Sequence, residues 1–286
     1  MRTVRTVAAL REALAPARRD GATIGVVPTM GALHAGHLSL IEAARRDTDV
    51  VVVTLFVNPT QFAPTEDLDA YPRDEAGDAR AAERAGADIL FAPPVEEIYP
   101  DGFSTTVHVT GVSEPLEGAA RGGTHFDGVA TVVTKLFNMV QPDVAYFGRK
   151  DAQQLAVIRR MVADLNLPVR VVGCPTVREP DGLAMSSRNA YLTPEERPRA
   201  LALSRALAAA RESVAAGETD AAAVAAAARA PMDELGVEPE YLTVVDPETF
   251  QPVTSVDRDV LVAIAARVGR ARLIDNDTIS PNGSRP

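Results

Sequence analysis

The chain of 286 residues carries 29 lysines and arginines against 39 aspartates and glutamates, a formal net charge of −10. This acidic balance disfavours nucleic acid and anionic membranes as partners, because both bind basic surfaces. The single cysteine, Cys174, excludes an intrachain disulfide and a cysteine-based zinc site, and we expect it to be a small buried side chain. The longest apolar run, at 50–57, is far short of a membrane span of about 20 residues. We therefore expect an acidic globular protein in the cytoplasm.

The first 176 residues alternate predicted strands with predicted helices. Short apolar runs rich in β-branched residues predict the strands, and the long run at 50–57 is typical of a strand buried on both faces. The strands are expected at 22–27, 50–57, 88–91, 144–147 and 169–172, and the helices at 38–46, 74–85 and 152–164. This alternation predicts an α/β fold with a doubly wound parallel sheet, in one domain over residues 1–176.

The composition changes after residue 176. Half of the residues at 201–230 are alanine, and a polar break at 217–220 divides them into two predicted helices, with Asp220 as N-cap of the second. Short strands are expected at 241–245, 260–265 and 270–274. We predict a smaller α+β domain over residues 177–276 and a disordered tail at 277–286, which is polar and contains proline and glycine.

Two of the four histidines, His34 and His37, lie three residues apart between the first predicted strand and the following helix. At a helix start this spacing places both imidazoles on one face, beside free N–H groups that favour phosphate. Gly36 leaves room for a ligand to approach the backbone. The carboxyl end of a parallel strand is also where α/β sheets bind ligands. We favour a ligand site, while a pair of capping or packing histidines is the structural alternative.

Positive charge is carried by 27 arginines and only two lysines, Lys135 and Lys150. Lys150 follows the strand at 144–147 and begins a helix, so its ammonium is placed to meet a phosphate oxygen. Asp151 beside it can cap the helix or bind a metal or an amine. Lys135 lies in an apolar helical stretch, and we expect it to snorkel to the surface.

A third segment, Met185–Arg188, brings two hydroxyls and a guanidinium near the expected domain boundary, a set suited to an oligophosphate. On its own a Ser-Ser-Arg sequence is common in plain linkers. Its combination with an earlier His-x-Gly-His segment is specific, because both belong to one kind of nucleoside-triphosphate site.

Four separated motifs together resemble the pantothenate synthetase family of the nucleotidylyltransferase superfamily. They are Pro28–His37, the stretch Phe56–Phe62, Phe147–Gln154 and Met185–Arg188, in the order and spacing of that family. The resemblance implies that ATP, pantoate and β-alanine give pantothenate, AMP and pyrophosphate through a pantoyl adenylate. It also implies Mg²⁺ with ATP, a homodimer, a Rossmann-like first domain and a lid-like second domain.

The residues at matching positions of the four motifs are expected to have the roles that they have in the family. The resemblance implies that His37 is the catalytic histidine, that His34 and Lys150 stabilise charge on the phosphates, and that Gln61 and Gln154 hold pantoate. The residues expected to contact ATP are Met30, Gly31, Ala32, Leu33, His34, Ala35, Gly36, His37, Gly148, Arg149, Lys150, Asp151, Val177, Met185, Ser186, Ser187 and Arg188.

The match departs from the family pattern at two places. The family's Arg-Pro-x-His-Phe stretch is one residue longer here, from Arg121 to Phe126, so no role is carried over to Arg121 or His125. Of the expected metal-binding carboxylates only Asp78 is present, so Mg²⁺ is expected to rest largely on the ATP phosphates. Gln153, next to Gln154, is expected to be a surface side chain.

Two other functions stay open at this point. One is a nucleotidylyltransferase that retains the nucleotide on its product, and the other is a non-catalytic ATP-binding module. Release of free AMP separates ligation from nucleotide transfer, and any turnover excludes the module.

Overall fold

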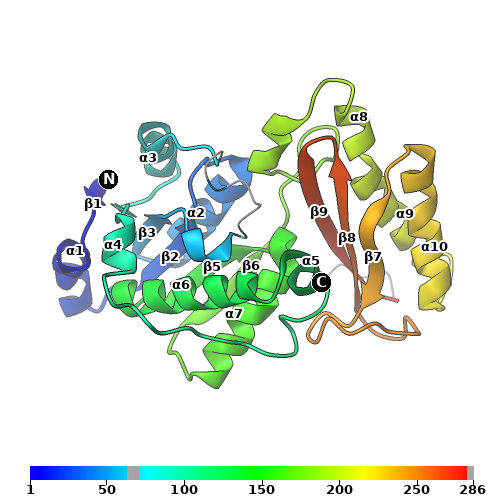
Figure 1. Ribbon diagram of the computed structural model, residues 1–286. Coiled ribbons are helices and arrows are strands. Elements are labelled where there is room, and N and C mark those ends of the chain that lie inside the picture. The colour runs from blue at the N-terminus through cyan, green and yellow to red at the C-terminus, as the bar shows by residue number, and fades with distance from the viewer. Residues whose placement is uncertain (63–67, 69–70, 282–286) are drawn as a thin grey trace.

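Six parallel strands form the larger of two sheets in the computed structural model, which describes residues 1–62, 68 and 71–281 (Figure 1). Their order across the sheet is β1-β4-β3-β2-β5-β6. The strands are β1 (Arg2–Val4), β2 (Ile24–Thr29), β3 (Val50–Leu55), β4 (Ile89–Phe91), β5 (Val144–Gly148) and β6 (Arg170–Cys174).

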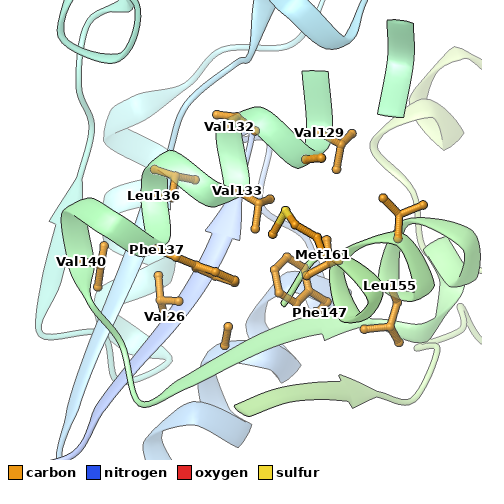
Figure 2. Close-up of a cluster of buried hydrophobic side chains, with 14 of the residues drawn as sticks. Val26, Val129, Val132, Val133, Leu136, Phe137, Val140, Phe147, Leu155 and Met161 are labelled. Carbon is orange, nitrogen blue, oxygen red and sulfur yellow. The ribbon is translucent and has the colours of Figure 1, made fainter. Parts of the chain in front are cut away.

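Helices cover both faces of this sheet. The central strands are apolar on both sides: Val26 and Phe147 point to one face, and Val27 and Tyr146 to the other. The first face packs against α1 (Val7–Arg19), α6 (Thr124–Val140) and α7 (Ala152–Asp164), and the second against α2 (Ala35–Asp47) and α3 (Glu75–Arg84). Figure 2 shows the first core, in which side chains of α6 and α7 meet Val26 and Phe147. The predicted doubly wound sheet is confirmed.

The order in which the chain adds strands to the sheet reverses between β2 and β5. β2 pairs with β3 on one side and with β5 on the other, and the chain reaches β3 through α2 on one face and β5 through α6 on the opposite face. The loops after β2 and β5 therefore diverge and leave a crevice at the carboxyl ends of these strands. Short helical elements border it: η1 (Pro59–Gln61), η2 (Arg149–Asp151), η3 (Ser187–Tyr191) and α5 (Glu117–Arg121), while the short helix α4 (Val95–Ile98) follows β4.

The second sheet is antiparallel, with the order β7-β8-β9. Its strands are β7 (Pro239–Val245), β8 (Val260–Val268) and β9 (Ala271–Ile279), and its helices are α8 (Arg197–Ala200), α9 (Ala202–Ala215) and α10 (Ala221–Glu234). The helices share a core with one face of the sheet. Leu261 and Ala263 on the other face, together with Phe250, belong to the core of the larger sheet, so the two sheets are packed together.

Most predicted elements are present, and the main differences lie at their ends. The two alanine-rich helices are α9 and α10, and Asp220 caps the second, since its carboxylate accepts the N–H of Ala222. Strand β2 continues through Pro28 to Thr29 rather than ending before the proline. Pairing with β5 has already ended at Val26, so the proline interrupts no hydrogen bond on that side.

The predicted tail begins too early. Asp277–Ile279 complete β9 and pair with β8, because the long apolar run of β8 needs a partner along its whole length. Residues 282–286 of the predicted tail lie outside the described residues. Strand β1 and helices α1, α4, α5 and α8 are not anticipated by the sequence analysis, and α6 is anticipated only as an apolar helical stretch around Lys135. Among the described helices, none is both long and apolar enough to span a membrane.

Candidate functional site

A cavity of about 220 Å³ lies in the crevice at the ends of β2 and β5. Its predicted site residues come from four segments that are far apart in the sequence: the start of α2, the turn η1, the turn η2 with the first residues of α7, and the stretch 175–188, while apolar side chains of α6 line it as well. The predicted site residues that it brings together are Met30, His34, Gly36, His37, Gln61, Gly148, Lys150, Asp151, Gln154, Val177, Met185, Ser186, Ser187 and Arg188.

His34 and His37 form a reciprocal pair at the start of α2. Nδ1 of His34 accepts the N–H of Gly36 at 3.2 Å, and Nδ1 of His37 accepts the N–H of His34 at 3.3 Å. The two rings lie with centroids 4.1 Å apart and both line the cavity. The histidines therefore cap the helix, as the structural alternative expects, and they also line the cavity, while their role as a ligand site stays a prediction.

Both imidazoles are neutral at pH 7. Burial lowers the pKa of His37 from 6.5 to about 3, assisted by the neighbouring His34 and Lys150. Burial also lowers the pKa of His34, with Lys150 contributing in the same direction. Because Nδ1 of each neutral ring accepts a backbone N–H, its proton lies on Nε2. Each ring thus offers one N–H donor to a ligand.

Asp78 holds the turn that precedes this pair. Its buried carboxylate accepts the N–H of Ala32 at 2.9 Å and the N–H of Leu33 at 2.7 Å. Gly31 has a φ of +88°, and a Cβ there would lie 2.9 Å from the Asp78 carboxylate, so only glycine fits. The residues Gly31–Leu33 therefore shape the turn and do not line the cavity.

The protein offers no preformed cage for a divalent metal in the described residues. No group of three histidine, cysteine, aspartate or glutamate side chains there could hold an ion. Both oxygens of Asp78, the expected metal ligand, already accept backbone hydrogen bonds. The donor set does not fit a magnesium ion held by protein side chains.

Gly36 lies against protein atoms. A Cβ at Gly36 would lie 2.9 Å from the His34 ring and 3.6 Å from Cβ of Met185. The His34 imidazole therefore occupies the position that a Cβ of residue 36 would take, while Gly36 itself lines the cavity, and its contact with a ligand stays a prediction. The distance to Cβ of Met185 shows that the stretch containing Met185 lies directly over the start of α2.

Lys150 lies on η2, with Nζ 3.5 Å from the Asp151 carboxylate, and it is largely covered. Arg149 points elsewhere: it is exposed, it does not line the cavity, and its Nε donates to the carbonyl of Gly173 at 3.1 Å. Lys135, the other lysine, also lies outside the cavity, with Nζ 4.4 Å from the centre of the Phe103 ring.

The stretch that carries Ser186–Arg188 begins as a hairpin. Arg178 and Ala184 form an antiparallel bridge, and the N–H of Met185 donates to the carbonyl of Val177 at 2.9 Å. Ser186 then caps η3, since its hydroxyl accepts the N–H of Arg188 at 3.3 Å. The hairpin thus explains why Val177 and Met185 meet at the cavity although eight positions separate them.

Gln61 is held by a buried amide network that the sequence analysis did not identify. Asn58, which is 1% exposed, donates to Oε1 of Gln61 at 3.0 Å and to the carbonyl of Gly128 at 3.1 Å. His125 contacts the carbonyl of Gln61 through Nδ1 at 2.8 Å and Nη1 of Arg121 through Nε2 at 2.9 Å. A guanidinium only donates, so the neutral His125 carries its proton on Nδ1.

The adjacent glutamines have different surroundings. Gln154 lines the cavity as predicted, whereas Gln153 is 4% exposed and not a surface residue. Its amide accepts the N–H of Glu117 at 3.0 Å and donates to the carbonyls of Val112 and Pro115 at 2.9 and 2.7 Å. Gln153 therefore fixes the loop before α5, because helical spacing turns it away from the side that Gln154 occupies.

A second cavity of about 300 Å³ continues from the first toward the antiparallel sheet. Lys150, Asp151, Gln154, Ser186 and Arg188 line both. Beyond them the wall is formed by strands of the second sheet and by Glu117, whose carboxylate pairs with Arg272 at 2.7 Å. The two cavities together form one continuous crevice, which runs from the ends of β2 and β5 to the antiparallel sheet. Cys174, as predicted, is buried, and it is not among the residues that line either cavity.

Comparison with known proteins relates the whole chain to one family. A family described as pantoate-beta-alanine ligase matches residues 2–278. The pantothenate synthetases of Rhizorhabdus wittichii and Thermotoga neapolitana are each 54% identical to this chain, over 98% and 96% of its length and 99% of theirs.

Solved structures give the same result. Pantothenate synthetase of Thermus thermophilus superposes with a TM-score of 0.94 at 51% identity, covering 98% of this chain and all of the other. The ligase of Francisella tularensis, complexed with beta-gamma ATP and beta-alanine, superposes with a TM-score of 0.81 at 32% identity, covering 98% of this chain and 99% of the other.

Proposed function

The chain belongs to the pantoate–β-alanine ligase family, and we propose that it uses the crevice described above to join pantoate to β-alanine at the expense of ATP. One observation carries the assignment of this site. The cavity brings together the two histidines, Lys150, Ser186–Arg188 and two glutamines from four distant segments. Hydrogen-bond donors for phosphate oxygens and amide groups for a polar acid therefore lie around one space.

ATP binds along the start of α2 and η2. The helix N-terminus and the Nε2–H groups of His34 and His37 favour the α-phosphate, and the Lys150 ammonium lies across the same cavity. Ser186, Ser187 and Arg188 bind the β- and γ-phosphates. Magnesium arrives as part of the MgATP substrate, which agrees with the lack of a preformed cage in the described residues.

The first step activates the acid. A carboxylate oxygen of pantoate attacks the α-phosphorus in line, forming the acyl–phosphate bond as the bond to pyrophosphate breaks. His34, His37 and Lys150 stabilise the negative charge that develops on the phosphate oxygens and the leaving group. Gln61 and Gln154 hold pantoate with amide groups that do not titrate.

The second step forms the amide. The neutral amine of β-alanine attacks the acyl carbon of the pantoyl adenylate, AMP leaves with the bonding electrons, and the amine loses a proton. The partly enclosed crevice between the sheets limits the access of water to the adenylate. The family resemblance implies that Gln61, which lines the first cavity, also lies near β-alanine.

Three further properties belong to this proposal. The family resemblance supports a homodimer and a lid-like movement of residues 177–276 against residues 1–176. The movement is consistent with the position of Ser186–Arg188 on the second part of the chain, between the two cavities. A cytoplasmic location is supported by the biosynthetic nature of the family.

A pyrophosphate-release assay tests the function. With ATP and pantoate alone we expect pyrophosphate and an enzyme-bound adenylate, and added β-alanine should release AMP and pantothenate in equal amounts. Retention of the nucleotide on the product would identify a nucleotidylyltransferase instead. Absence of pyrophosphate with all three substrates would leave only the non-catalytic module.

A further inference from the structure

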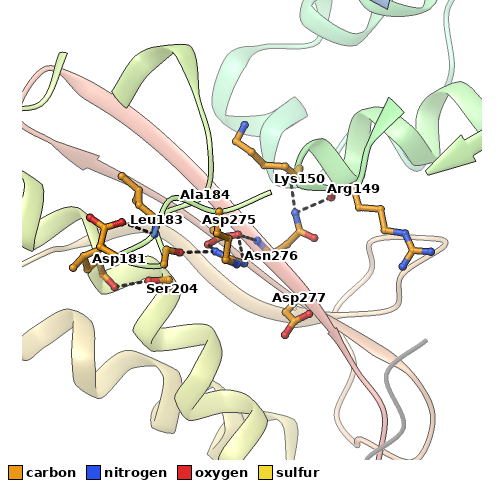
Figure 3. A network of polar contacts seen from close by, with 12 residues as sticks. Arg149, Lys150, Asp181, Leu183, Ala184, Ser204, Asp275, Asn276 and Asp277 are labelled. Atoms are coloured by element: carbon orange, nitrogen blue, oxygen red, sulfur yellow. Dashed lines mark hydrogen bonds and ion pairs between the residues drawn. The ribbon is translucent and has the colours of Figure 1, made fainter. Parts of the chain in front are cut away.

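Two consecutive residues of β9, Asp275 and Asn276, contact the two phosphate-binding segments on either side of the crevice. Neighbouring side chains of a strand point in opposite directions. Figure 3 shows Asn276 reaching the turn of Lys150, while Asp275 lies toward the hairpin that contains Leu183 and Ala184. One strand of the antiparallel sheet thus touches both segments.

Asn276 holds the turn that presents Lys150. Its Nδ2 donates to the carbonyl of Lys150 at 2.6 Å and to the carbonyl of Arg149 at 3.2 Å. Both are backbone carbonyls of η2, which connects β5 to α7, so both hydrogen bonds restrain the path of η2 itself. The side chain of Lys150 is then free to face the cavity.

Asp275 holds the hairpin before Ser186–Arg188. Its carboxylate is 3% exposed and receives both terminal nitrogens of Arg178, at 2.6 and 3.0 Å. Arg178 also donates to the carbonyl of Gly182 at 3.1 Å, across the hairpin turn. A bidentate pair of this kind fixes orientation as well as distance.

We propose that Asp275 and Asn276 are positioning residues that set the separation between Lys150 and Ser186–Arg188, and thereby the fit of the triphosphate between them. This inference rests on the proposed function, because it assigns those two segments to ATP. It also gives the C-terminal sheet a role in the reaction, although the two residues touch the phosphate-binding segments and not the reacting groups.

The Asn276→Ala variant tests the first contact. We expect the KM and the Kd for ATP to rise roughly 2- to 12-fold, the scale of one net hydrogen bond lost from the turn, with the KM for pantoate and β-alanine unchanged. Thr278→Ala, two residues further along the same face of β9, is the matched control and should leave the affinity for ATP unchanged. A variant that loses only thermal stability, with wild-type affinity for ATP, would overturn the proposal.

A double-mutant cycle shows whether Asn276 acts through Lys150. If it does, Asn276→Ala should have no further effect on the Kd for ATP in a Lys150→Ala background. Equal effects in both backgrounds would contradict the proposal. For the second contact, Arg178→Lys keeps the charge and loses the bidentate geometry, and its effect should vanish in an Arg188→Ala background.

Titration calorimetry with ATP keeps the two hypotheses apart. A wild-type chain that binds ATP but forms no pantothenate would contradict the proposed function while the cycle still measures the coupling. A chain that forms pantothenate with independent effects at Asn276 and Lys150 would retain the function and exclude the positioning role.

Discussion

The N–H of His34 donates to Nδ1 of His37 over 3.3 Å, and this contact determines which nitrogen of His37 faces the cavity. With Nδ1 occupied, the neutral ring presents Nε2–H, which is a hydrogen-bond donor and not a base, as the proposed contact with the α-phosphate requires. The contact also makes each histidine depend on the backbone of the other, as in a capping box. The backbone at the start of α2 therefore determines that His37 carries its proton on Nε2.

Replacing His37 by alanine should lower kcat by about 10²- to 10³-fold, the scale of one preorganised electrostatic contact. The KM for pantoate should change little, because Gln61 and Gln154 remain. Steady-state measurement of AMP release checks this, with His108→Ala as control, since His108 is an exposed histidine paired with Asp127. Wild-type turnover by the His37→Ala enzyme would remove His37 from the mechanism.

The depressed pKa of His37 also predicts a dependence of stability on pH. The unfolded chain binds a proton near pH 6.5 that the folded chain binds only near pH 3. The contribution of this group to the free energy of unfolding is therefore complete above pH 6.5. It is lost as the pH falls toward 3, with a slope of at most about 1.4 kcal/mol per pH unit. Urea unfolding at several pH values should show a shallower loss for His37→Asn, and parallel curves would contradict the assignment.

Lysine is present at only two positions, which provides an internal control for Lys150. Lys150→Ala should lower kcat by about 10²- to 10³-fold, because the ammonium is the only lysine charge at the cavity. Lys135→Ala should retain wild-type kinetics, since Lys135 packs over the rings of Tyr99 and Phe103. A comparable loss in both variants would indicate a general effect of charge and not a role at the site.

Asp78 is predicted to act as a backbone anchor and not as a metal ligand. Asp78→Asn replaces one acceptor oxygen by a donor and should lower activity by roughly 10- to 100-fold, the cost of a charged hydrogen bond. Because the loss arises from the turn at Ala32 and Leu33, additional Mg²⁺ should not restore activity. Glu75→Gln on the same helix, at an exposed pair with Arg5, is the control. Recovery of the Asp78→Asn enzyme at high Mg²⁺ would favour a metal-binding role.

A comparison of Asp78 with Lys150 shows which site residues can be predicted from the sequence. The sequence predicts a role for Lys150 because this residue follows a predicted strand and because lysine is rare in the chain. The partners of Asp78 are N–H groups of Ala32 and Leu33, more than forty positions away, and they come within reach only when α3 packs beside the start of α2. Motifs at strand ends locate the cavity, while the contacts that hold those motifs depend on tertiary packing.

The same limit applies to the second part of the chain. The alternation of strands and helices predicts the parallel sheet, and short apolar runs predict the strands of the second part, but the sequence gives no sign that β9 reaches the turn of Lys150. Asn276 is an ordinary polar residue in a strand, and its significance comes from the carbonyls opposite it. Likewise, Asn58 is recognised as part of the site only through its burial and its bond to Gln61.

Substitutions at the neighbouring residues Gln153 and Gln154 should have opposite effects, one on the stability of the fold and the other on the binding of pantoate. Gln153→Ala removes three hydrogen bonds and leaves the carbonyls of Val112 and Pro115 buried, so the free energy of unfolding should fall by about 1–3 kcal/mol. The KM for pantoate should stay close to that of the wild type. Gln154→Ala should do the reverse, raising the KM for pantoate about tenfold, since it removes about one hydrogen bond to the substrate.

Urea unfolding and pantoate kinetics on both variants decide this, with Gln251→Ala as an exposed control. Loss of stability in Gln154→Ala without a change in KM would place Gln154 among the structural residues. A raised KM in Gln153→Ala alone would mean that the loop before α5, and not Gln154, determines how pantoate is held.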